Sequence, residues 1–404
     1  MNSRNRVIIA LNHKEPDKMP IDFGGTPGTG ISVIAYNNLK RYLNLSGQKA
    51  KLYDLMQQIV EPEEEVLKMI EADIVLLYRE APRFNLSLSK WKTWTLKDSS
   101  QCLVSEDYNP IVNNNGDMNI IENNVIVAKM TKEGLYYDLV YYPLAQIEES
   151  EEVDKLQFPT ISDKELAYLK TRATELYENT EYAIVGAFGG SFIEFGLRCF
   201  GYEKFLMDLV MNQTMLRRWF DRLAESYLLN LEKYLHSVGK YIQVIQFSDD
   251  MGTQNSLMFS KSLYREIVKP YHKMLYQYVK SHYPHIKILL HSCGAIYELI
   301  PDLIEVGVDA LNPIQISATG MDPVKLKKEF GKDLTFWGGG ANMQYTVNNG
   351  TIGDIHREVE RLVKIFKPGG GFIFAPVHNV QANVSPERIM AIYNTAKTCR
   401  NYNK

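Results

Sequence analysis

The stretch IKILLHSCGAIYELIPDLIEVGVDALNPIQ, residues 286–315, contains the pattern that decides the fold. An apolar run at 286–291 ends in polar residues, a helical pattern follows at 295–305, and a second apolar run occupies 308–311. A strand, a helix and a second strand at this spacing predict a βαβ unit, whose two strands pair in parallel.

The alternation continues on both sides of this unit. The other apolar runs that are expected to be strands lie at 20–23, 73–78, 182–186, 242–247, 334–337 and 372–375. The helical patterns that lie between or beside them are at 31–42, 202–236, 260–283, 323–330, 352–366 and from 386 onward. Eight such strands predict an α/β fold, a (β/α)8 TIM barrel. A doubly wound open sheet has the same periodicity and stays open as an alternative.

Residues 90–142 break this rhythm. Short alternating segments are separated there by turn residues, and Asn115-Gly116-Asp117 is a strong turn signal. We expect a small antiparallel β insertion after the second strand, within a single domain of residues 1–404. Barrel insertions often build the mouth of an active site. The insertion contains four aromatic residues of interest, Trp91, Trp94, Tyr136 and Tyr137. They are expected either to close over a substrate or to pack within the insertion.

The composition excludes several classes of protein. The 404 residues carry 45 Lys and Arg against 48 Asp and Glu, so no bulk charge points to nucleic acid or to an acidic membrane. No apolar stretch is long enough to span a bilayer, and the run at 7–11 is too short for a signal-peptide core. The 4 cysteines are widely spaced and form no disulfide framework, which indicates a reducing, cytoplasmic compartment.

Polar residues gather just after the expected strands, where a barrel carries its chemistry. His291 and Cys293 end the strand at 286–291 and alternate on extended backbone, so both side chains point to one face. His378 follows the last strand in a similar position. One thiolate and two imidazoles with an open fourth position form a ligand pattern of catalytic zinc. For His378, a substrate contact is the alternative.

Further candidates follow other strands. Asp249 and Asp250 come after the strand at 242–247, and adjacent strand residues point in opposite directions, so at most one of them faces the pocket. We expect Asp249, His291 and Cys293 to be catalytic. Asp249 is expected to orient a ligand imidazole, to supply a fourth ligand or to carry a proton. It is also expected to contact the substrate. Helix capping is the alternative for Asp250. The other candidate substrate-binding residues are Gln254, Gln315, Asn379 and Gln381.

Two other features are expected to be structural. The glycine-rich stretches at 338–340 and 369–371 match no phosphate-binding or dinucleotide fingerprint, which indicates tight turns. The remaining histidines fall on helical or loop patterns and are expected at the surface: His13, His236, His272, His282, His285 and His356.

The segments around these residues resemble a known family. They are HSCGAIYELIPDLIEVGVDALNPIQ at 291–315, FSDDMGTQ at 247–254, GGGFIFAPVHNVQANVSPERI at 369–389 and NRVIIALNHKEPDKMPIDFGG at 5–25. Together they are similar to the uroporphyrinogen decarboxylase superfamily, and specifically to its cobalamin-dependent methyltransferase branch. The resemblance covers most of the chain except 90–142. It implies a (β/α)8 barrel that binds zinc through His, Cys and a third ligand near the last strand.

Two departures from the family pattern bear on function. The decarboxylases carry an arginine-containing N-terminal loop that holds porphyrinogen carboxylates, whereas the matching residues 22–28 contain no arginine. The related methylcobalamin:thiol methyltransferases usually carry a cysteine where this chain has His378. One thiolate and two imidazoles leave a zinc site at a net charge of about +1, and the more positive ion is the stronger Lewis acid, unless a bound Asp249 cancels the charge.

These observations lead to the hypothesis of a zinc-dependent methyltransferase. It moves a methyl group from a small methylated (methoxy-type) substrate to the Co(I) corrinoid (cobalamin) of a partner protein. A partner is expected to carry the corrinoid because this chain shows no cobalamin-ligating histidine motif. The alternatives are a methylcobalamin:thiol methyltransferase, a non-enzymatic binder of corrinoid or porphyrin, and a metal-free uroporphyrinogen decarboxylase-like lyase with an arginine-lined pocket. The arginines available to such a lyase are Arg79, Arg83 and Arg198. The resemblance implies a monomer or a homodimer.

Overall fold

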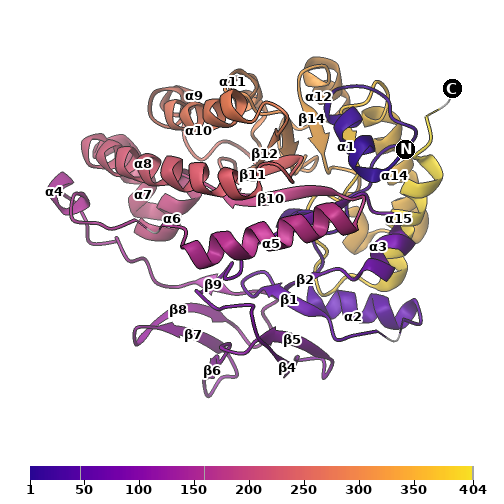
Figure 1. Ribbon diagram of the computed structural model, residues 1–404, viewed down its shortest axis with the longest axis horizontal. Coiled ribbons are helices and arrows are strands. Elements are labelled where there is room, and N and C mark those ends of the chain that lie inside the picture. Colours follow the sequence, from indigo (N-terminus) through magenta and orange to yellow (C-terminus); the bar gives the residue numbers. More distant parts are fainter. Residues whose placement is uncertain (46, 159, 403–404) are drawn as a thin grey trace.

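The computed structural model describes residues 1–45, 47–158 and 160–402. At its centre is a curled sheet of seven parallel strands (Figure 1). Their order is β15-β14-β13-β12-β11-β10-β3, so strands that follow one another along the chain are neighbours. A doubly wound sheet reverses its order at one point, and this order therefore excludes that alternative. The strands are β3 (Ile74–Leu77), β10 (Ala183–Gly189), β11 (Val244–Ser248), β12 (Lys287–His291), β13 (Ala310–Asn312), β14 (Thr335–Trp337) and β15 (Phe372–Ile373).

The strands form from short apolar runs, and helices cover the outside of the sheet. In β12, Ile288, Leu289 and Leu290 are all fully buried, as expected for a strand that is packed on both faces. Parallel pairing requires the chain to cross back after each strand, and helices provide these crossovers. The larger helices are α1 (Ser3–Leu11), α2 (Val33–Tyr42), α3 (Glu64–Ile70), α5 (Asp163–Asn179), α6 (Ile193–Phe200), α7 (Tyr202–Met211), α8 (Gln213–Val238), α10 (Lys269–His282), α11 (Ile300–Glu305), α12 (Pro323–Phe330), α14 (Ile352–Phe366) and α15 (Pro386–Cys399).

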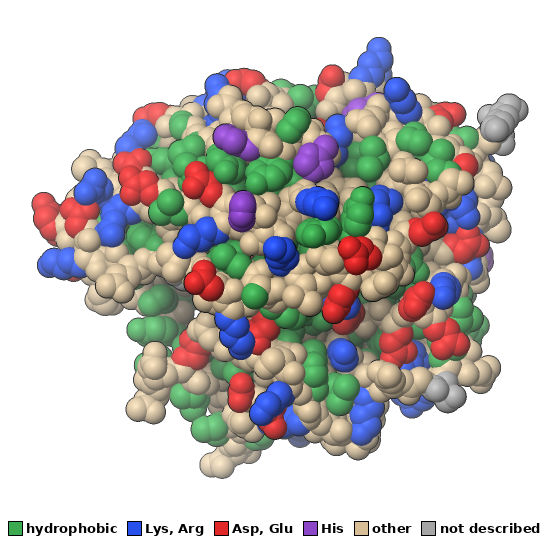
Figure 2. Space-filling model, viewed as in Figure 1, with side chains coloured by type: hydrophobic (Ala, Val, Ile, Leu, Met, Phe, Trp, Pro, Cys, Tyr) green, Lys and Arg blue, Asp and Glu red, His purple; other side chains and the backbone are tan. Residues whose placement is uncertain are grey.

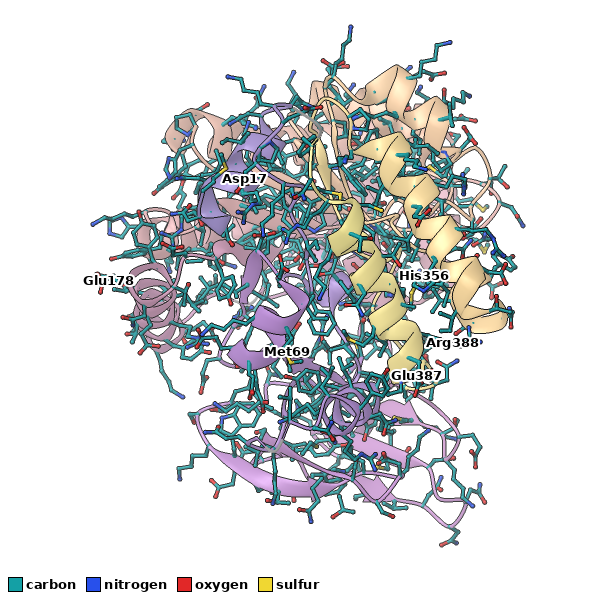
Figure 3. The ribbon with its side chains drawn as sticks, turned by 90° about the vertical axis from the view of Figure 1, so that its right-hand side faces the viewer. Asp17, Met69, Glu178, His356, Glu387 and Arg388 are labelled. Atoms are coloured by element: carbon teal, nitrogen blue, oxygen red, sulfur yellow. The ribbon has the colours of Figure 1, made fainter. Side chains whose placement is uncertain are left out.

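Helix α14 shows how the sequence sets a helix of this outer layer. Thr351 and Asp354 form a capping box at its start, in which each side chain accepts a bond from the other residue's backbone N–H. Figure 3 shows α14 beside α15, with His356 between the two helices. His356 Nδ1 lies 2.5 Å from Thr395 Oγ1 of α15. The buried side chains of α14 recur every three or four residues, as Ile355, Val359, Leu362, Val363 and Phe366.

Residues 20–22 link the two edges of the central sheet. Their backbone exchanges hydrogen bonds with Phe374, next to β15, and accepts one from the N–H of Asp73, next to β3. The expectation of eight strands in the barrel is therefore corrected, because among the described residues the central sheet has seven strands, and residues 20–22 form only this short bridging segment. Pro20 has no N–H to donate, and the chain turns at Gly24, where φ is +87°, so too few residues remain for a ladder.

Two further sheets lie below the central sheet in Figure 1, with the orders β2-β1-β5-β4 and β6-β7-β8-β9. Within residues 90–142 all strand pairs are antiparallel, but this segment is divided between the two sheets. Its strand β5 also pairs in parallel with β1, part of a hairpin at 51–61 that the sequence analysis did not anticipate. The strands are β1 (Lys51–Asp54), β2 (Ile59–Glu61), β4 (Trp91–Thr95), β5 (Gln101–Ser105), β6 (Ile111–Val112), β7 (Met118–Glu122), β8 (Val125–Met130) and β9 (Asp138–Leu139).

A large hydrophobic cluster joins these parts. It extends from Met19 to Ala396 and includes Cys102 and Val104 of β5. A second, smaller cluster contains side chains of the central strands such as Leu76, Val185 and Leu289. On the face shown in Figure 2, acidic and basic side chains are interspersed, in agreement with the nearly balanced counts of charged residues. Among the described residues, no helix combines the length and the apolar character needed to cross a membrane.

Candidate metal centre and its cavity

His291, Cys293 and His378 converge at the carboxyl end of the central sheet. His291 is the last residue of β12, Cys293 follows it in the next loop, and His378 lies in the loop after β15. One possible ligand atom from each of the three lies within 4.8 Å of the other two. His291 Nε2 is 3.4 Å from Cys293 Sγ, and the two imidazole rings are 5.9 Å apart. The predicted metal-ligand residues are therefore brought together.

This donor set fits a zinc ion. With Zn–S near 2.3 Å and Zn–N near 2.0–2.1 Å, tetrahedral geometry places the nitrogen and sulfur about 3.5 Å apart. The observed Nε2–Sγ separation of 3.4 Å agrees with that value. A sulfur and two imidazole nitrogens also match the preference of zinc for borderline-soft ligands, and three protein ligands leave a fourth position open.

His291 is held in one orientation by its neighbours. Its Nδ1 donates to Asn312 Oδ1 at 2.7 Å, which leaves Nε2 free to face Cys293. Asn312 is itself oriented, since its Nδ2 donates to the carbonyl of Trp337 at 3.0 Å. Gly28 packs against the ring, because a Cβ at that position would lie 2.7 Å from His291 Cε1. The ligand is therefore preorganised by hydrogen bonding and by packing.

The protonation states of the cluster suit a cation. Burial lowers the pKa of His378 to about 4, and the nearby His291 adds to this shift, so the imidazole is neutral at physiological pH. Burial raises the pKa of the Cys293 thiol well above its ordinary value, and Asp250 and Glu194 raise it further. A thiol in such surroundings ionises when a metal ion binds and releases its proton.

Asp249 does not join this cluster, which corrects its predicted catalytic and substrate-binding role. Its carboxylate is fully buried and accepts bonds from the backbone N–H groups of residues 192–194, at 3.0, 3.2 and 2.8 Å. Its fourth donor is His272 Nε2 at 3.0 Å. His272 is also fully buried, so the expectation of a surface histidine is wrong there. The Asp249 carboxylate thus fixes the start of α6 instead of facing the cavity.

Asp250 is the acidic residue that faces the cluster. Its Oδ1 accepts a bond from the Cys293 backbone N–H at 2.8 Å and lies 4.0 Å from His291 Nε2. The sequence predicts that at most one of the two aspartates faces the pocket, and that residue is Asp250 instead of the expected Asp249. Asp250 does not cap the helix that follows Ser260, where the Ser260 side chain is the cap, but holds the loop that carries Cys293.

The four predicted amides hold the loops around the cluster. Gln315 accepts from Gly294 N–H and donates to Gln254 Oε1, both at 2.8 Å. Gln381 donates to Asn379 at 2.5 Å, and Asn379 donates in turn to Gln57 at 2.6 Å. None of the four predicted amides is among the residues that line the cavity at the cluster. The structure therefore gives them a positioning role.

A cavity of about 280 Å³ opens beside His291 and His378. Its walls come from the carboxyl ends of the strands and from the β1–β2 hairpin, whose Tyr53, Asp54 and Gln57 the sequence analysis missed. Arg79, Arg83 and Arg198 line it too, together with the rings of Tyr78 and Phe188 and the amide of Gln246. Arg83 is paired with Asp54 at 3.1 Å, and Arg198 is paired with Glu194.

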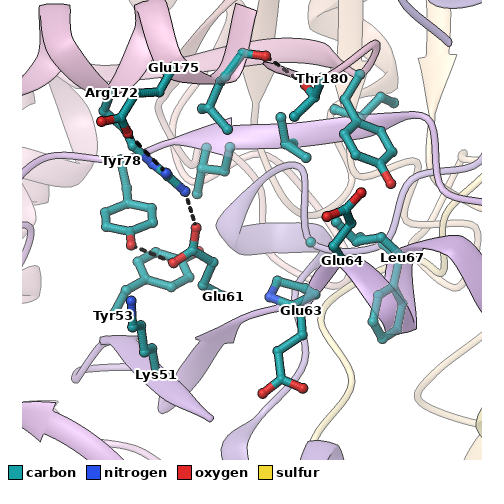
Figure 4. A pocket seen from close by; sticks show the side chains of 18 of the residues that line it. Lys51, Tyr53, Glu61, Glu63, Glu64, Leu67, Tyr78, Arg172, Glu175 and Thr180 are labelled. Carbon is teal, nitrogen blue, oxygen red and sulfur yellow. Dashed lines mark hydrogen bonds and ion pairs between the residues drawn. The ribbon is translucent and has the colours of Figure 1, made fainter. Parts of the chain in front are cut away.

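A second cavity, of about 490 Å³, lies beyond the wall formed by Tyr53 and Tyr78. Figure 4 shows its ion-paired side: Tyr78 donates to Glu61 at 2.8 Å, and Glu61 pairs with Arg172 at 2.7 Å. The Tyr53 and Tyr78 rings stack with their centroids 4.7 Å apart. This larger cavity contains none of the three cluster residues, so we place the candidate chemistry in the smaller one.

The aromatic residues of the 90–142 segment pack against one another or against its surroundings. Trp94 contacts Tyr108 edge-to-face at 5.1 Å, and the hydroxyls of Tyr108 and Tyr137 lie 2.7 Å apart. Trp91 lies 5.6 Å from Lys51 Nζ, and Tyr136 is largely exposed. Because none of these aromatic residues lines the cavity at the cluster, the packing alternative describes them.

The fold and the cluster together define the class of protein: a parallel α/β barrel-like chain with His and Cys side chains gathered at the carboxyl end of its strands. The sequence pattern of the family Uroporphyrinogen decarboxylase (URO-D) matches residues 142–399, and the chain belongs to this family. Uroporphyrinogen decarboxylases of Chlorobium limicola and Chlorobium phaeobacteroides are 24% identical to it over 260 and 262 residues, which is 61% of this chain and 68% of each relative.

A solved structure is similar over almost the whole chain. It is a methyltransferase from Methanosarcina mazei, which superposes with a TM-score of 0.60 and covers 98% of this chain and 99% of its own. The sequence identity is 13%, so this similarity establishes a shared fold.

Proposed function

We propose that this chain is a zinc-dependent methyltransferase, which moves a methyl group from a small methylated (methoxy-type) substrate to the Co(I) corrinoid of a partner protein. The observation that carries the proposal is the convergence of His291, Cys293 and His378 beside a cavity, with ligand atoms within 4.8 Å of one another. The family and the fold of a methyltransferase agree with an enzyme of this class.

The charge of the ligand set favours transfer from substrate to corrinoid. One thiolate and two neutral imidazoles leave a divalent site at a net charge of about +1. A zinc ion held there supplies a Lewis acid for the leaving oxygen of the methylated substrate. Asp249 does not cancel this charge, since its carboxylate is committed to α6 and His272.

The chain's own residues position the reacting groups. Asn312 and Gly28 fix the His291 ring, and Asp250 fixes the backbone at Cys293. With substrate and a reduced corrinoid bound, the electron pair of the broken C–O bond would stay on oxygen, which would take a proton from solvent. The corrinoid would supply the electron pair of the new bond to the methyl carbon.

One observation favours a second candidate function, a metal-free uroporphyrinogen decarboxylase-like lyase. Arg79, Arg83 and Arg198 all line the cavity, as that alternative predicts. The two candidates differ in their need for metal: the lyase keeps its activity after chelation. A methylcobalamin:thiol methyltransferase uses the same cluster and differs in requiring methylcobalamin and a thiol.

We also propose that residues 1–404 act as one domain that carries 90–142 as an insertion. The large hydrophobic cluster from Met19 to Ala396 supports this, because it includes residues of the barrel and of β5 in that segment. The corrinoid protein is expected to approach transiently, and the chain itself to be a monomer or a homodimer.

Metal analysis of the purified chain tests the cluster. We expect about one zinc per chain, lost from His291→Ala, Cys293→Ala and His378→Ala variants. Cys399→Ala is the matched control, because Cys399 is a free cysteine outside the cluster, and it should keep the metal. A chain without zinc, or with zinc that survives all three cluster variants, would reject the proposal.

A methyl-transfer assay tests the direction. The zinc-loaded chain is mixed with a reduced corrinoid protein and a panel of methoxy compounds, and the spectrum of the corrinoid reports methylation. We expect transfer that stops on chelation and in Cys293→Ala. A strict requirement for methylcobalamin and a thiol would instead assign the chain to the thiol methyltransferases.

A further inference from the structure

Unused hydrogen-bonding capacity is concentrated in the cavity beside the cluster. Among the described residues, the buried side-chain atoms without a partner include Tyr53 Oη, Arg79 Nε and Gln246 Oε1, and all three residues line this cavity. Tyr53 is only 3% exposed and Gln246 only 6% exposed. Since leaving a buried polar group without a partner is unfavourable, such a concentration indicates that a bound molecule completes the bonds.

The cations of this cavity are not equally engaged. Arg83 bonds to Asp54 at 3.1 Å, and Arg198 bonds to Glu194, so both are already paired. The acidic partner of Arg79 among the described residues is Glu165, at 3.7 Å from its Nε, which is beyond hydrogen-bond distance. Arg79 is therefore the guanidinium best able to take an anion from outside the chain.

Tyr53 is able to donate to the same anion. Burial raises the pKa of Tyr53 well above its ordinary value, with the nearby Asp54 adding to the shift, so its hydroxyl keeps its proton. Gln246 adds the opposite requirement: its Oε1 is an acceptor, and it needs an N–H or O–H from a ligand. The stacked rings of Tyr53 and Tyr78 and the ring of Phe188 supply flat apolar walls.

We propose that this part of the cavity is a substrate subsite for the acid group of a small organic acid. Arg79 and Tyr53 donate to the acid group, and Gln246 accepts from a hydroxyl or amino group of the same molecule. The subsite rests on the proposed function in one respect only, namely that the bound acid carries the methyl group to be transferred. The preferred substrate class is thus a methylated organic acid that also carries a hydroxyl or amino group.

Isothermal titration of the zinc-loaded chain tests the subsite directly. The probes are methoxyacetate, 4-methoxybenzoate and 4-hydroxy-3-methoxybenzoate, each compared with its neutral amide of nearly the same shape. We expect at least one acid to bind about tenfold or more tightly than its amide, with the hydroxylated acid the tightest. Equal binding of acids and amides, or no binding of any acid at millimolar concentration, would overturn the subsite.

Two variants locate the effect. Tyr53→Phe removes only a hydroxyl without a partner, so it should weaken acid binding about tenfold and leave the unfolding temperature unchanged or raised. Arg79→Gln should remove the preference for acids over amides. Tyr402→Phe is the matched control, because its hydroxyl is also buried without a partner but lies outside the cavity. Acid binding that survives both cavity variants would refute the assignment.

Titration of the chain as purified and after zinc loading, together with the metal analysis and the methyl-transfer assay, separates this subsite from the proposed function. Preference for acids without zinc binding or methyl transfer would reject the methyltransferase and keep the subsite. Methyl transfer from neutral methoxy compounds, with amides bound as tightly as acids, would keep the methyltransferase and reject the subsite.

Discussion

His291 donates its Nδ1 proton to Asn312 Oδ1 across 2.7 Å, and this contact between the ends of two neighbouring strands orients the ligand imidazole. Asn312 is fully buried and is bonded on its other side to the carbonyl of Trp337. The contact therefore ties the geometry of the candidate metal centre to the register of β12, β13 and β14.

Removing this contact should weaken metal binding. In Asn312→Ala the His291 ring loses the acceptor that fixes its orientation and tautomer, and we expect zinc affinity to fall about 10–100-fold. Competition with a chromophoric chelator measures the affinity, and circular dichroism confirms that the variant is folded. Unchanged affinity in a folded variant would show that Asn312 does not position the ligand.

Crowding the His291 ring should have a similar effect by another route. A Cβ in Gly28→Ala would lie 2.7 Å from His291 Cε1 and 3.0 Å from Asn312 Oδ1, so the ring must shift. We expect weaker zinc binding in the same competition assay. Gly353→Ala is the matched control, since its Cβ would meet only ordinary contacts at 3.4 Å or more. Equal zinc affinity in the two variants would argue against a packed ligand.

The two adjacent aspartates should separate in their effects. Asp249→Asn breaks a carboxylate with four buried donors, and we expect a loss of about 3–5 kcal/mol in the free energy of unfolding with zinc content unchanged. Asp250→Ala should change stability less and weaken zinc binding, because it frees the loop at Cys293. Denaturant titration and metal analysis of both variants check this, and the reverse pattern would restore Asp249 to the catalytic site.

Asp22 should make stability depend on pH. Burial raises the pKa of Asp22 from 3.8 to about 6, although Trp337 donates to it at 2.7 Å. Between these two pKa values the folded chain holds a proton that the unfolded chain loses, and protonation of Asp22 therefore stabilises the folded state. This stabilisation is full below about pH 4 and is lost as the pH rises through 6.

The non-titrating variant Asp22→Asn isolates this effect. The stability of the natural chain relative to Asp22→Asn should fall by up to about 3 kcal/mol between pH 4 and pH 7, as the size of the pKa shift implies. Denaturant titrations of both chains across this range measure the difference. A difference that is constant or that grows with pH would contradict a buried, protonated Asp22.

Much of the sheet was predictable because its strands are apolar runs with clear helical crossovers. The β1–β2 hairpin was missed for a physical reason: its turn, residues 55–58, contains no Gly, Asn or Pro. The turn is instead held by Asp54, whose Oδ1 accepts from Gln57 N–H at 2.9 Å. A tertiary partner, β5, completes the hairpin, and such long-range pairing leaves no local signal.

The candidate site was predictable only in part. His291 and Cys293 carry a local signal, because alternate residues of a strand end point to one face. The choice between Asp249 and Asp250 depends on where α6 begins in space, which the sequence of the β11 loop does not contain. Tyr53 and Gln246 have no motif at all, and they become visible only as buried groups without partners.

The central claim is that sulfur from Cys293 and imidazole nitrogens from His291 and His378 bind one zinc ion. X-ray absorption at the zinc edge of the metal-loaded chain tests it most directly. We expect one sulfur neighbour at about 2.3 Å and nitrogen or oxygen neighbours at about 2.0–2.1 Å, with the sulfur shell absent in Cys293→Ser. A spectrum with no sulfur shell, or one that Cys293→Ser leaves unchanged, would contradict it.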